Sequence, residues 1–294
     1  RSAHGNESLE FLIKENLKYF QLGAVGPDLP YSQIPRILNG QEKIADKFHY
    51  EQTSQLPLKV FPKIKLMADS PLRDQAFAFF LGFVSHIVAD GIIHPFVRDK
   101  VGDYEKNKSA HRELEMKLDV LLFHEMTNDS GSASNLNFTD HHKQLKDVLA
   151  KGFSHVSELM ARTINEVYGE NVCSKDVEDW IDDMHDMFQL AETENSQFYA
   201  RLPGMKSFLF SDTESILNDK EAILFLKNED AKDRSGSFLG RDVHFVKDCL
   251  PMFYRVFAPI ALRLHSYVYE TGDALTEIDF PAINLDTGRS LTAA

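Results

Sequence analysis

Hydrophobic residues recur along the chain at the three- and four-residue spacing of α-helices, and no alternating strand pattern is sustained. The first region with helical spacing covers residues 6–22, and a loop rich in glycine and proline follows at residues 23–31. Shorter helices are expected at residues 41–49 and 56–67. Pro71 suits the first turn of a long helix, which we expect to end near Pro95. The predicted fold class is therefore all-α.

The rest of the chain continues this helical pattern. A helix is expected over residues 109–126, and a polar connection follows it. Further helices are expected at residues 143–168, 175–202, 213–226 and 241–271, the last of them kinked at Pro251 and Pro259. We expect a multi-helix bundle in which residues 1–130 form the half that carries the site. Residues 131–294 form a helical C-terminal region packed on that half, within one continuous domain.

One segment of the long predicted helix is apolar on nearly every side, yet it carries two histidines and an aspartate. The segment reads FFLGFVSHIVADGIIHP, and His86, Asp90 and His94 are four residues apart in it. Side chains with this spacing share one face of a helix and lie about 6 Å apart along its axis. A helix that is apolar all round is buried, and buried imidazole and carboxylate groups are costly unless they are paired or bind metal.

The spacing along this helix separates two candidate metal sites. His86 and His94 are eight residues apart, about 12 Å along a helix, whereas zinc–nitrogen bonds are about 2.0–2.1 Å long. One ion therefore cannot bind both histidines while the helix stays regular. The next predicted helix offers His111 and Glu115, again four residues apart, as partners for His94. Two histidines and a glutamate with an open fourth position are typical of catalytic zinc.

Donors for the other ion occur upstream. Asp28 in the sequence GPD and His49 in the sequence KFHYE would complete a four-ligand site with His86 and Asp90. Each element has a plain structural alternative, because a lone His-x-x-x-Glu pair is often a surface pair and Gly-Pro-Asp is often a turn. The joint pattern favours metal. Nitrogen and carboxylate ligands without thiolate favour zinc and leave manganese and iron open.

Composition limits the partners of the protein. A net charge of −13 argues against a stable nucleic-acid partner, whose phosphate backbone needs clustered Lys and Arg. A small phosphate ester stays open, because a bound cation can reverse the local field. No run of eighteen apolar residues occurs, so we expect no transmembrane segment, and transient contact with a membrane surface remains compatible with the sequence. Two cysteines make no disulfide framework and leave the compartment undetermined.

Four stretches together resemble the bacterial zinc-dependent phospholipase C family. They read LGAVGPDLPY, KFHYEQT, FFLGFVSHIVADGIIHP and HRELEMKLD, and they follow the family's order over about the first 125 residues. The pattern H-x-x-x-D-x-x-x-H-P followed by H-x-x-x-E is specific, whereas G-P-D alone is weak. The resemblance implies two zinc ions, one held by Asp28, His49, His86 and Asp90 and the other by His94, His111 and Glu115.

The resemblance also implies a third ion, which shares the helix aspartate, here Asp90, and takes further ligands from the N-terminus. His4 is the candidate histidine in that region, although its local sequence differs from the family's. The headgroup pocket does not transfer, since Leu29 follows Asp28 where the best-known members have an aromatic residue. Choline specificity is therefore not implied.

The reaction these residues favour is hydrolysis of a phosphodiester in a phospholipid headgroup by a metal-activated water. Asp28 is a candidate general base in this reaction. One alternative is a zinc nuclease acting on single-stranded nucleic acid, because such nucleases resemble the same arrangement of metal sites. The other alternative is a helical protein that binds metal without catalysis.

Overall fold

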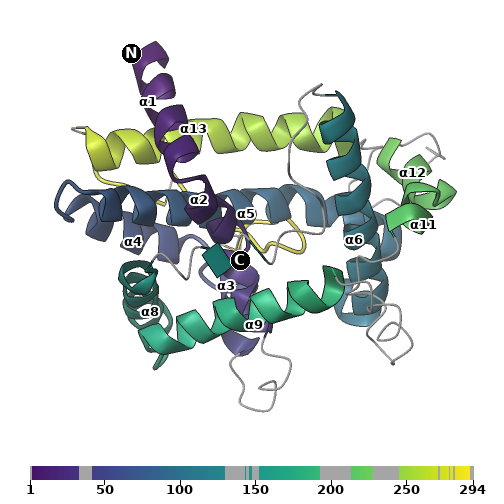
Figure 1. The fold of residues 1–294 in the computed structure, drawn as a ribbon, viewed down its shortest axis with the longest axis horizontal. Helices are drawn as coiled ribbons and strands as arrows, with labels where there is room; N and C mark the ends of the chain where they lie inside the picture. The colour runs from purple at the N-terminus through teal and green to yellow at the C-terminus, as the bar shows by residue number, and fades with distance from the viewer. Residues whose placement is uncertain are drawn as a thin grey trace. The chain divides into compact units, whose positions relative to one another are not determined.

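The structure is a computed structural model that describes most of the chain, namely residues 2–32, 42–129, 143, 146–147, 152–192, 213–227, 245–270, 272–277, 279–280 and 282–291. Every regular element in these ranges is helical (Figure 1). Within them, the β structure is an isolated bridge between Ile283 and Ser290. The prediction of an all-α fold is therefore confirmed.

The helices keep the order expected from the sequence. In chain order they are α1 (Ser2–Glu15), α2 (Leu17–Ala24), the 3-10 helix η1 (Gly26–Ser32), α3 (Glu42–Tyr50), α4 (Gln55–Lys65), α5 (Pro71–Val101), α6 (Tyr104–Asp129), α8 (Ser154–Tyr168), α9 (Ser174–Glu192), α11 (Thr213–Leu217), α12 (Lys220–Lys227), the π-helical turn η5 (Phe245–Cys249) and α13 (Leu250–Tyr269).

Among the regions predicted as single helices, 6–22 and 213–226 are each divided in two, and residues 152–153, within the predicted helix 143–168, are not helical. The region 6–22 breaks at Asn16, whose side-chain amide donates to the Leu12 carbonyl, and α2 begins at the next residue. The region 213–226 breaks before Lys220, because the Asp219 carboxylate accepts the first backbone N–H groups of α12. Short polar side chains compete with helix hydrogen bonds in this way.

The long helix α5 continues past Pro95 to Val101, so the predicted end near Pro95 is wrong. Proline lacks the N–H that would donate to Gly91 four residues earlier, and its ring crowds that carbonyl. The helix persists because the residues after the proline, Phe96 and Val97, are fully buried in a hydrophobic cluster. Tertiary packing thus overrides the local signal.

The contacts of the chain divide it into two compact units. One unit comprises Arg1–Gly91, Gln144–Met184 and Phe253–Ala294, and the other comprises Ile92–Lys143 and His185–Met252. This division concerns packing, and the expected division of the chain at residue 130 stays a prediction.

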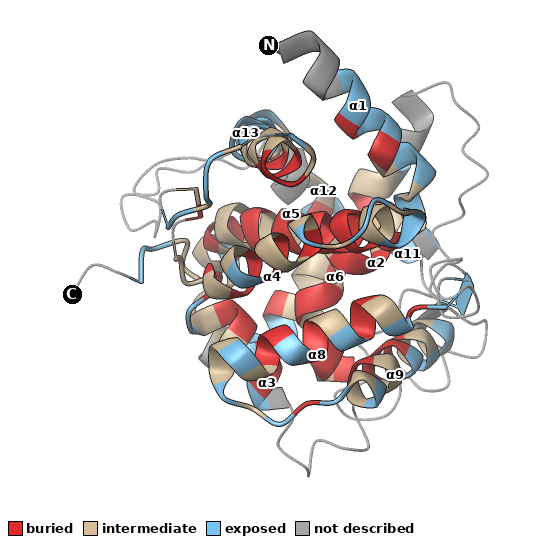
Figure 2. Cartoon of the chain, turned by 90° about the vertical axis from the view of Figure 1, so that its left-hand side faces the viewer, coloured by how far each residue is buried: buried red, intermediate tan, exposed pale blue. Residues whose placement is uncertain are grey.

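The first unit is built around the N-terminal part of α5. Four phenylalanines on all sides of that part, Phe77, Phe79, Phe80 and Phe83, are at most 1% exposed. Helix α13 lies alongside it in both ribbon views, and α4 packs on α8 (Figures 1 and 2). Helix α5 is also long and apolar enough to cross a membrane, but 67% of its most apolar window is buried inside the protein.

Helix α2 crosses α5 at two glycines that allow their backbones to touch. A Cβ atom on Gly23 would lie 1.8 Å from the Phe79 carbonyl oxygen, and one on Gly82 would lie 2.1 Å from the Phe20 carbonyl oxygen. No side chain fits at either position without separating the helices. The crossing brings the end of α2 and the following η1 beside the turn of α5 that carries His86.

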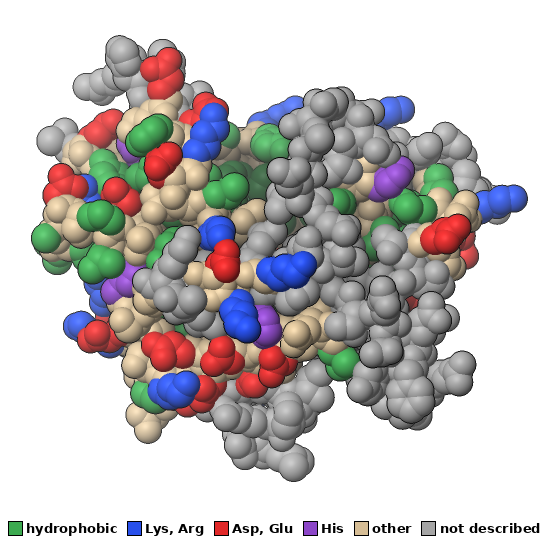
Figure 3. Space-filling model, in the orientation of Figure 1, with side chains coloured by type: hydrophobic (Ala, Val, Ile, Leu, Met, Phe, Trp, Pro, Cys, Tyr) green, Lys and Arg blue, Asp and Glu red, His purple; other side chains and the backbone are tan. Residues whose placement is uncertain are grey.

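The surface agrees with the acidic composition. On the face drawn in Figure 3, Asp and Glu side chains gather along the lower edge, in the region of α8 and α9. Several Lys and Arg side chains lie above them, near the centre of that face, and one lies among them.

Candidate metal centres

Two groups of side chains in the described residues could each hold a metal ion. In the first, Asp28, His49 and His86 present ligand atoms that all lie within 4.8 Å of one another. In the second, His94, His111 and Glu115 do the same. The first group lies within the first unit and the second within the other unit. The structure therefore brings together, in each group, residues that the sequence analysis named for the same site.

Helix ends and helix faces position the residues of the first group. Asp28 lies in the first turn of η1, and His49 lies in the last turn of α3. His86 and Asp90 project from successive turns of α5, four residues apart. The predicted fourth ligand, Asp90, contacts both histidines, with its Oδ2 atom 3.0 Å from His86 Nε2 and 3.6 Å from His49 Nε2.

Backbone carbonyls fix the orientation of both imidazoles in this group. His49 Nδ1 lies 2.7 Å from the Ala45 carbonyl oxygen, and His86 Nδ1 lies 2.8 Å from the Ala24 carbonyl oxygen. A carbonyl can only accept, so each Nδ1 carries the proton and donates it. Each Nε2 then presents its lone pair to the centre of the group, as metal-binding histidines do.

The distances among the Asp28, His49 and His86 ligand atoms are close to those around a tetrahedral zinc ion. Ligand atoms about 2.0–2.1 Å from a tetrahedral ion lie about 3.3 Å from one another. The two Nε2 atoms are 3.4 Å apart, and His49 Nε2 is 3.2 Å from Asp28 Oδ1. His86 Nε2 is 3.9 Å from that same oxygen. Two lone pairs this close need a proton or a cation between them.

The electrostatics of the first group also favour a cation. Burial alone would lower the pKa of His86, but the carboxylates of Asp90 and Asp28 raise that pKa to about 9. The carboxylates therefore favour a positive charge at this site. The site is largely buried, because the His49 side chain is 5% exposed and that of Asp90 is 15% exposed. Asp28 is 44% exposed and gives the group access to solvent.

The second group combines a residue of α5 with two residues of α6. Glu115 Oε1 lies 2.9 Å from His94 Nε2 and 3.1 Å from His111 Nε2. Burial raises the pKa of Glu115, but the two histidines outweigh burial and lower that pKa to about 2. The His111 side chain is fully buried, and its Nδ1 atom has no hydrogen-bond partner among the residues that the structure describes. Three protein ligands leave a fourth position for water or substrate.

His4 lies in α1, but its side chain is outside the described residues. The third ion that would use His4 and Asp90 therefore stays a prediction. The other seven predicted residues lie in or beside these two groups.

Contacts made by the backbone were not predicted from the sequence. The Ala24 and Ala45 carbonyls orient the two imidazoles, and the backbone N–H of Leu285 donates to the His49 carbonyl oxygen at 2.9 Å. A backbone group is the same in every residue, so no motif could indicate these partners. The hydrophobic residue Leu285 reads only as a candidate for the core.

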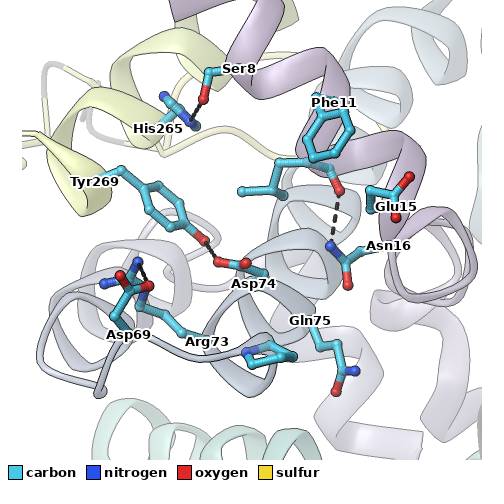
Figure 4. Close-up of a pocket in the computed structure, with 12 residues that line it drawn as sticks. Ser8, Phe11, Glu15, Asn16, Asp69, Arg73, Asp74, Gln75, His265 and Tyr269 are labelled. Carbon is cyan, nitrogen blue, oxygen red and sulfur yellow. Dashed lines mark hydrogen bonds and ion pairs between the residues drawn. The ribbon is translucent and has the colours of Figure 1, made fainter.

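A separate groove of about 540 Å³ lies in the first unit at the start of α5 (Figure 4). Ser8 Oγ lies 3.4 Å from His265 Nε2 in this groove, and the Tyr269 hydroxyl donates to Asp74 at 2.7 Å. Burial lowers the pKa of His265. Asp74 precedes His86 by twelve residues, about 18 Å along a helix. None of the seven predicted ligands whose side chains are described lines this groove.

Comparison with known proteins identifies one family. The family model described as zinc dependent phospholipase C matches residues 2–194, about two thirds of the chain. The matched part contains all eight residues predicted as ligands, from His4 to Glu115. No curated protein and no solved structure matches the chain.

Proposed function

Because the chain belongs to the zinc-dependent phospholipase C family, we propose that it is a zinc-dependent hydrolase of phosphodiesters whose substrate is a phospholipid headgroup. The observation that carries the proposal is the pair of imidazoles whose Nε2 atoms face each other at 3.4 Å beside two carboxylates. The second group adds a His₂Glu set with an open position, which is the ligand pattern of catalytic zinc.

We assign the ligands as follows. One ion is held by Asp28, His49, His86 and Asp90, and the other by His94, His111 and Glu115. The fit rests on the two Nε2 atoms that face each other in the first group and on the mixed nitrogen and carboxylate donors in both groups.

The protein's own residues prepare each site for hydrolysis. Zinc, when bound, supplies a Lewis acid that lowers the pKa of water and withdraws charge from phosphoryl oxygens. The Ala24 and Ala45 carbonyls accept the Nδ1 protons and orient both imidazoles, so that the Nε2 atom of each faces the position that a metal would occupy. Asp28 is the most exposed of the four ligands and can accept a proton from an incoming water as general base.

Metal content and substrate class test the proposal together. Purified protein should contain two zinc ions per chain and hydrolyse phospholipid vesicles and a chromogenic phosphodiester, and a chelator should abolish both activities. His94→Ala should lower the zinc content and abolish turnover. The matched control is His124→Ala, which removes an exposed histidine of the same α6 that carries His111 and Glu115.

The outcomes separate the alternatives. Turnover of phospholipid that is lost with the chelator and in His94→Ala supports the proposal. Cleavage of single-stranded DNA without phospholipid turnover would support a zinc nuclease instead, a reading that the net charge of −13 disfavours. Two bound zinc ions without turnover of any substrate would indicate a protein that binds metal without catalysis.

A further inference from the structure

The C-terminal segment of the chain meets the first candidate metal centre. Residues 282–291 lie outside residues 2–194, the part matched by the family model. They are nevertheless in contact with the end of α3, where His49 lies. This contact joins residues more than two hundred positions apart in the sequence.

The segment folds back on itself as a short hairpin. Ile283 and Ser290 form an antiparallel bridge, and the backbone N–H of Asn284 donates to the Arg289 carbonyl at 2.9 Å. The Asn284 side chain accepts from the N–H and the hydroxyl of Thr287 at 2.9 and 3.0 Å. The hairpin therefore has hydrogen bonds of its own, which hold Leu285 and Ile283 in place.

The hairpin completes the hydrogen bonding at the C-terminal end of α3. The last four carbonyls of a helix have no partner within it. The Lys47 carbonyl accepts a hydrogen bond from the Glu51 N–H in the following turn, at 3.0 Å. The His49 carbonyl accepts instead from the N–H of Leu285 at 2.9 Å, and the Leu285 side chain is fully buried.

A threonine in the turn after α3 forms the second connection. The Thr53 hydroxyl donates to the Ile283 carbonyl at 2.8 Å and accepts from the Ile283 N–H at 3.1 Å. Thr53 is 1% exposed. The turn itself is tight, since Gln52 has a φ of 49° in the left-handed region. Tying both sides of Ile283 to Thr53 therefore fixes the direction in which α3 ends.

The hairpin also reaches the helix that supplies the other ligands. A Cβ atom on Gly91 would lie 2.4 Å from Ile283 Cδ1, so the isoleucine occupies the space beside that glycine. Gly91 directly follows Asp90 in α5. The Ile283 side chain thus packs against α5 next to Asp90. The Ile283 backbone is hydrogen-bonded to Thr53 in the turn that follows His49.

From these contacts we infer that the C-terminal hairpin is a positioning element for the first metal ion, with Thr53 as its positioning residue. The inference rests on the proposed ligand role of His49 and Asp90. It extends the site beyond the family-matched region to a segment that no ligand motif marks. Groups that orient metal ligands typically change metal affinity by about 10–100-fold when they are removed.

The first test replaces Thr53 by valine, which keeps the shape and removes the hydroxyl. Competition with a chromogenic chelator measures the dissociation constants of both zinc ions in the full-length protein. Thr53→Val should weaken the binding of one zinc ion by about tenfold or more and leave the affinity for the other ion unchanged. Thr53→Ser retains the hydroxyl and should restore the affinity. In a His86→Ala background, Thr53→Val should have no further effect on the remaining ion.

The matched control is Thr163→Val. Thr163 is also fully buried in the first unit, but its hydroxyl donates to Leu159 within α8. An unchanged zinc affinity in Thr53→Val would overturn the inference. An equal loss of zinc affinity in Thr53→Val and Thr163→Val would also overturn it, because the effect would then follow stability rather than position.

A second, milder variant changes the hairpin itself. Asn284→Ala removes the hydrogen bonds to Thr287. It should lower the affinity for the same zinc ion, but by less than Thr53→Val does. Its control is Asn165→Ala, because the Asn165 amide forms two hydrogen bonds with Val172, both of 2.8 Å, in the connection after α8. Loss of zinc in Asn165→Ala but not in Asn284→Ala would contradict the inference.

The two levels of proposal fail in different ways. If the wild type binds two ions but hydrolyses no phosphodiester, the proposed function fails while the zinc measurements still support or overturn the positioning role. If the wild type is an active hydrolase and Thr53→Val retains full affinity for both ions, the positioning role fails and the proposed function stands.

Discussion

The Nε2 atoms of His49 and His86 lie 3.4 Å apart, and each imidazole donates its Nδ1 proton to a backbone carbonyl. Two nitrogen lone pairs therefore point at one position beside the Asp28 and Asp90 carboxylates. Such an arrangement is unfavourable unless a proton or a cation lies between them. A zinc ion held by these side chains, as we propose, would supply that cation.

Removing one negative charge from this arrangement should release one ion. Asp90→Asn keeps the size of the side chain and removes a carboxylate that contacts both histidines. We expect the zinc content to fall from two ions per chain towards one and phosphodiester turnover to be lost. Elemental analysis of dialysed protein measures the first effect. Asp147→Asn, at an exposed residue paired with Lys18, should keep both ions. Retention of two ions by Asp90→Asn would contradict the ligand assignment.

Metal removal should lower the stability of the fold. A ligand that binds only the native state stabilises it by about 2.7 kcal/mol when its free concentration is 100 times the dissociation constant. We therefore expect a chelator to lower the unfolding temperature and added zinc to restore it, as measured by scanning calorimetry. A variant that lacks ligands in both groups, His86→Ala with His94→Ala, should not respond to the chelator. An equal response in that variant would show that the chelator acts elsewhere.

The crossing of α2 and α5 should tolerate no side chain at Gly82. A Cβ there would lie 2.1 Å from a backbone oxygen, so the two helices must separate. Gly82→Ala should cost about 1–3 kcal/mol or more in the free energy of unfolding. It should also weaken zinc binding, because α2 ends at the Ala24 carbonyl that orients His86. Urea unfolding with zinc titration measures both effects.

Gly91→Ala is the matched control for that prediction. It is the same substitution in the same helix, but the new Cβ meets the flexible end of the Ile283 side chain. Because alanine is favoured over glycine in a helix by about 1 kcal/mol, we expect a smaller loss of stability than in Gly82→Ala. A larger loss at Gly91 than at Gly82 would contradict the importance of the backbone contact.

The ion pair between Lys117 of α6 and Asp219, 2.8 Å apart, should give a pH-dependent contribution to stability. The hydrogen bond from Lys117 lowers the pKa of Asp219 below its ordinary value of 3.8. A lowered folded-state pKa stabilises the protein above about pH 3.8, and this contribution is lost as the pH falls through the lower value.

Asp219→Asn tests this contribution, because asparagine can still accept the α12 backbone N–H groups. In chelated protein it should be less stable than the wild type near neutral pH by at most about 1 kcal/mol, and the difference should shrink below about pH 4. Denaturant unfolding at several pH values measures it. A difference that grows on acidification would have the wrong sign.

The grouping of the candidate ligand side chains was easier to predict from the sequence than the backbone contacts around them. Four-residue spacing in α5 and α6 assigned His86 and Asp90 to one group and His94, His111 and Glu115 to the other, because helical geometry makes such spacing readable. The predicted helix end at Pro95 was wrong, since burial of the following residues outweighs the local cost of proline.

Contacts made by backbone groups at the site could not be predicted from residue identity. The Leu285 N–H, the Ala24 carbonyl and the Ala45 carbonyl act through atoms that every residue has. Gly23 and Gly82 could have been read as helix-weakening residues, but only their close approach in space explains why glycine stands there. These positions depend on how helices pack, which a single sequence does not specify.

Anomalous diffraction at the zinc absorption edge, from crystals of the protein grown with zinc, tests the central claim most directly. The account predicts one peak among Asp28, His49, His86 and Asp90 and another among His94, His111 and Glu115, each about 2.0–2.2 Å from its ligand atoms. Zinc peaks elsewhere, with no density in either group, would contradict it.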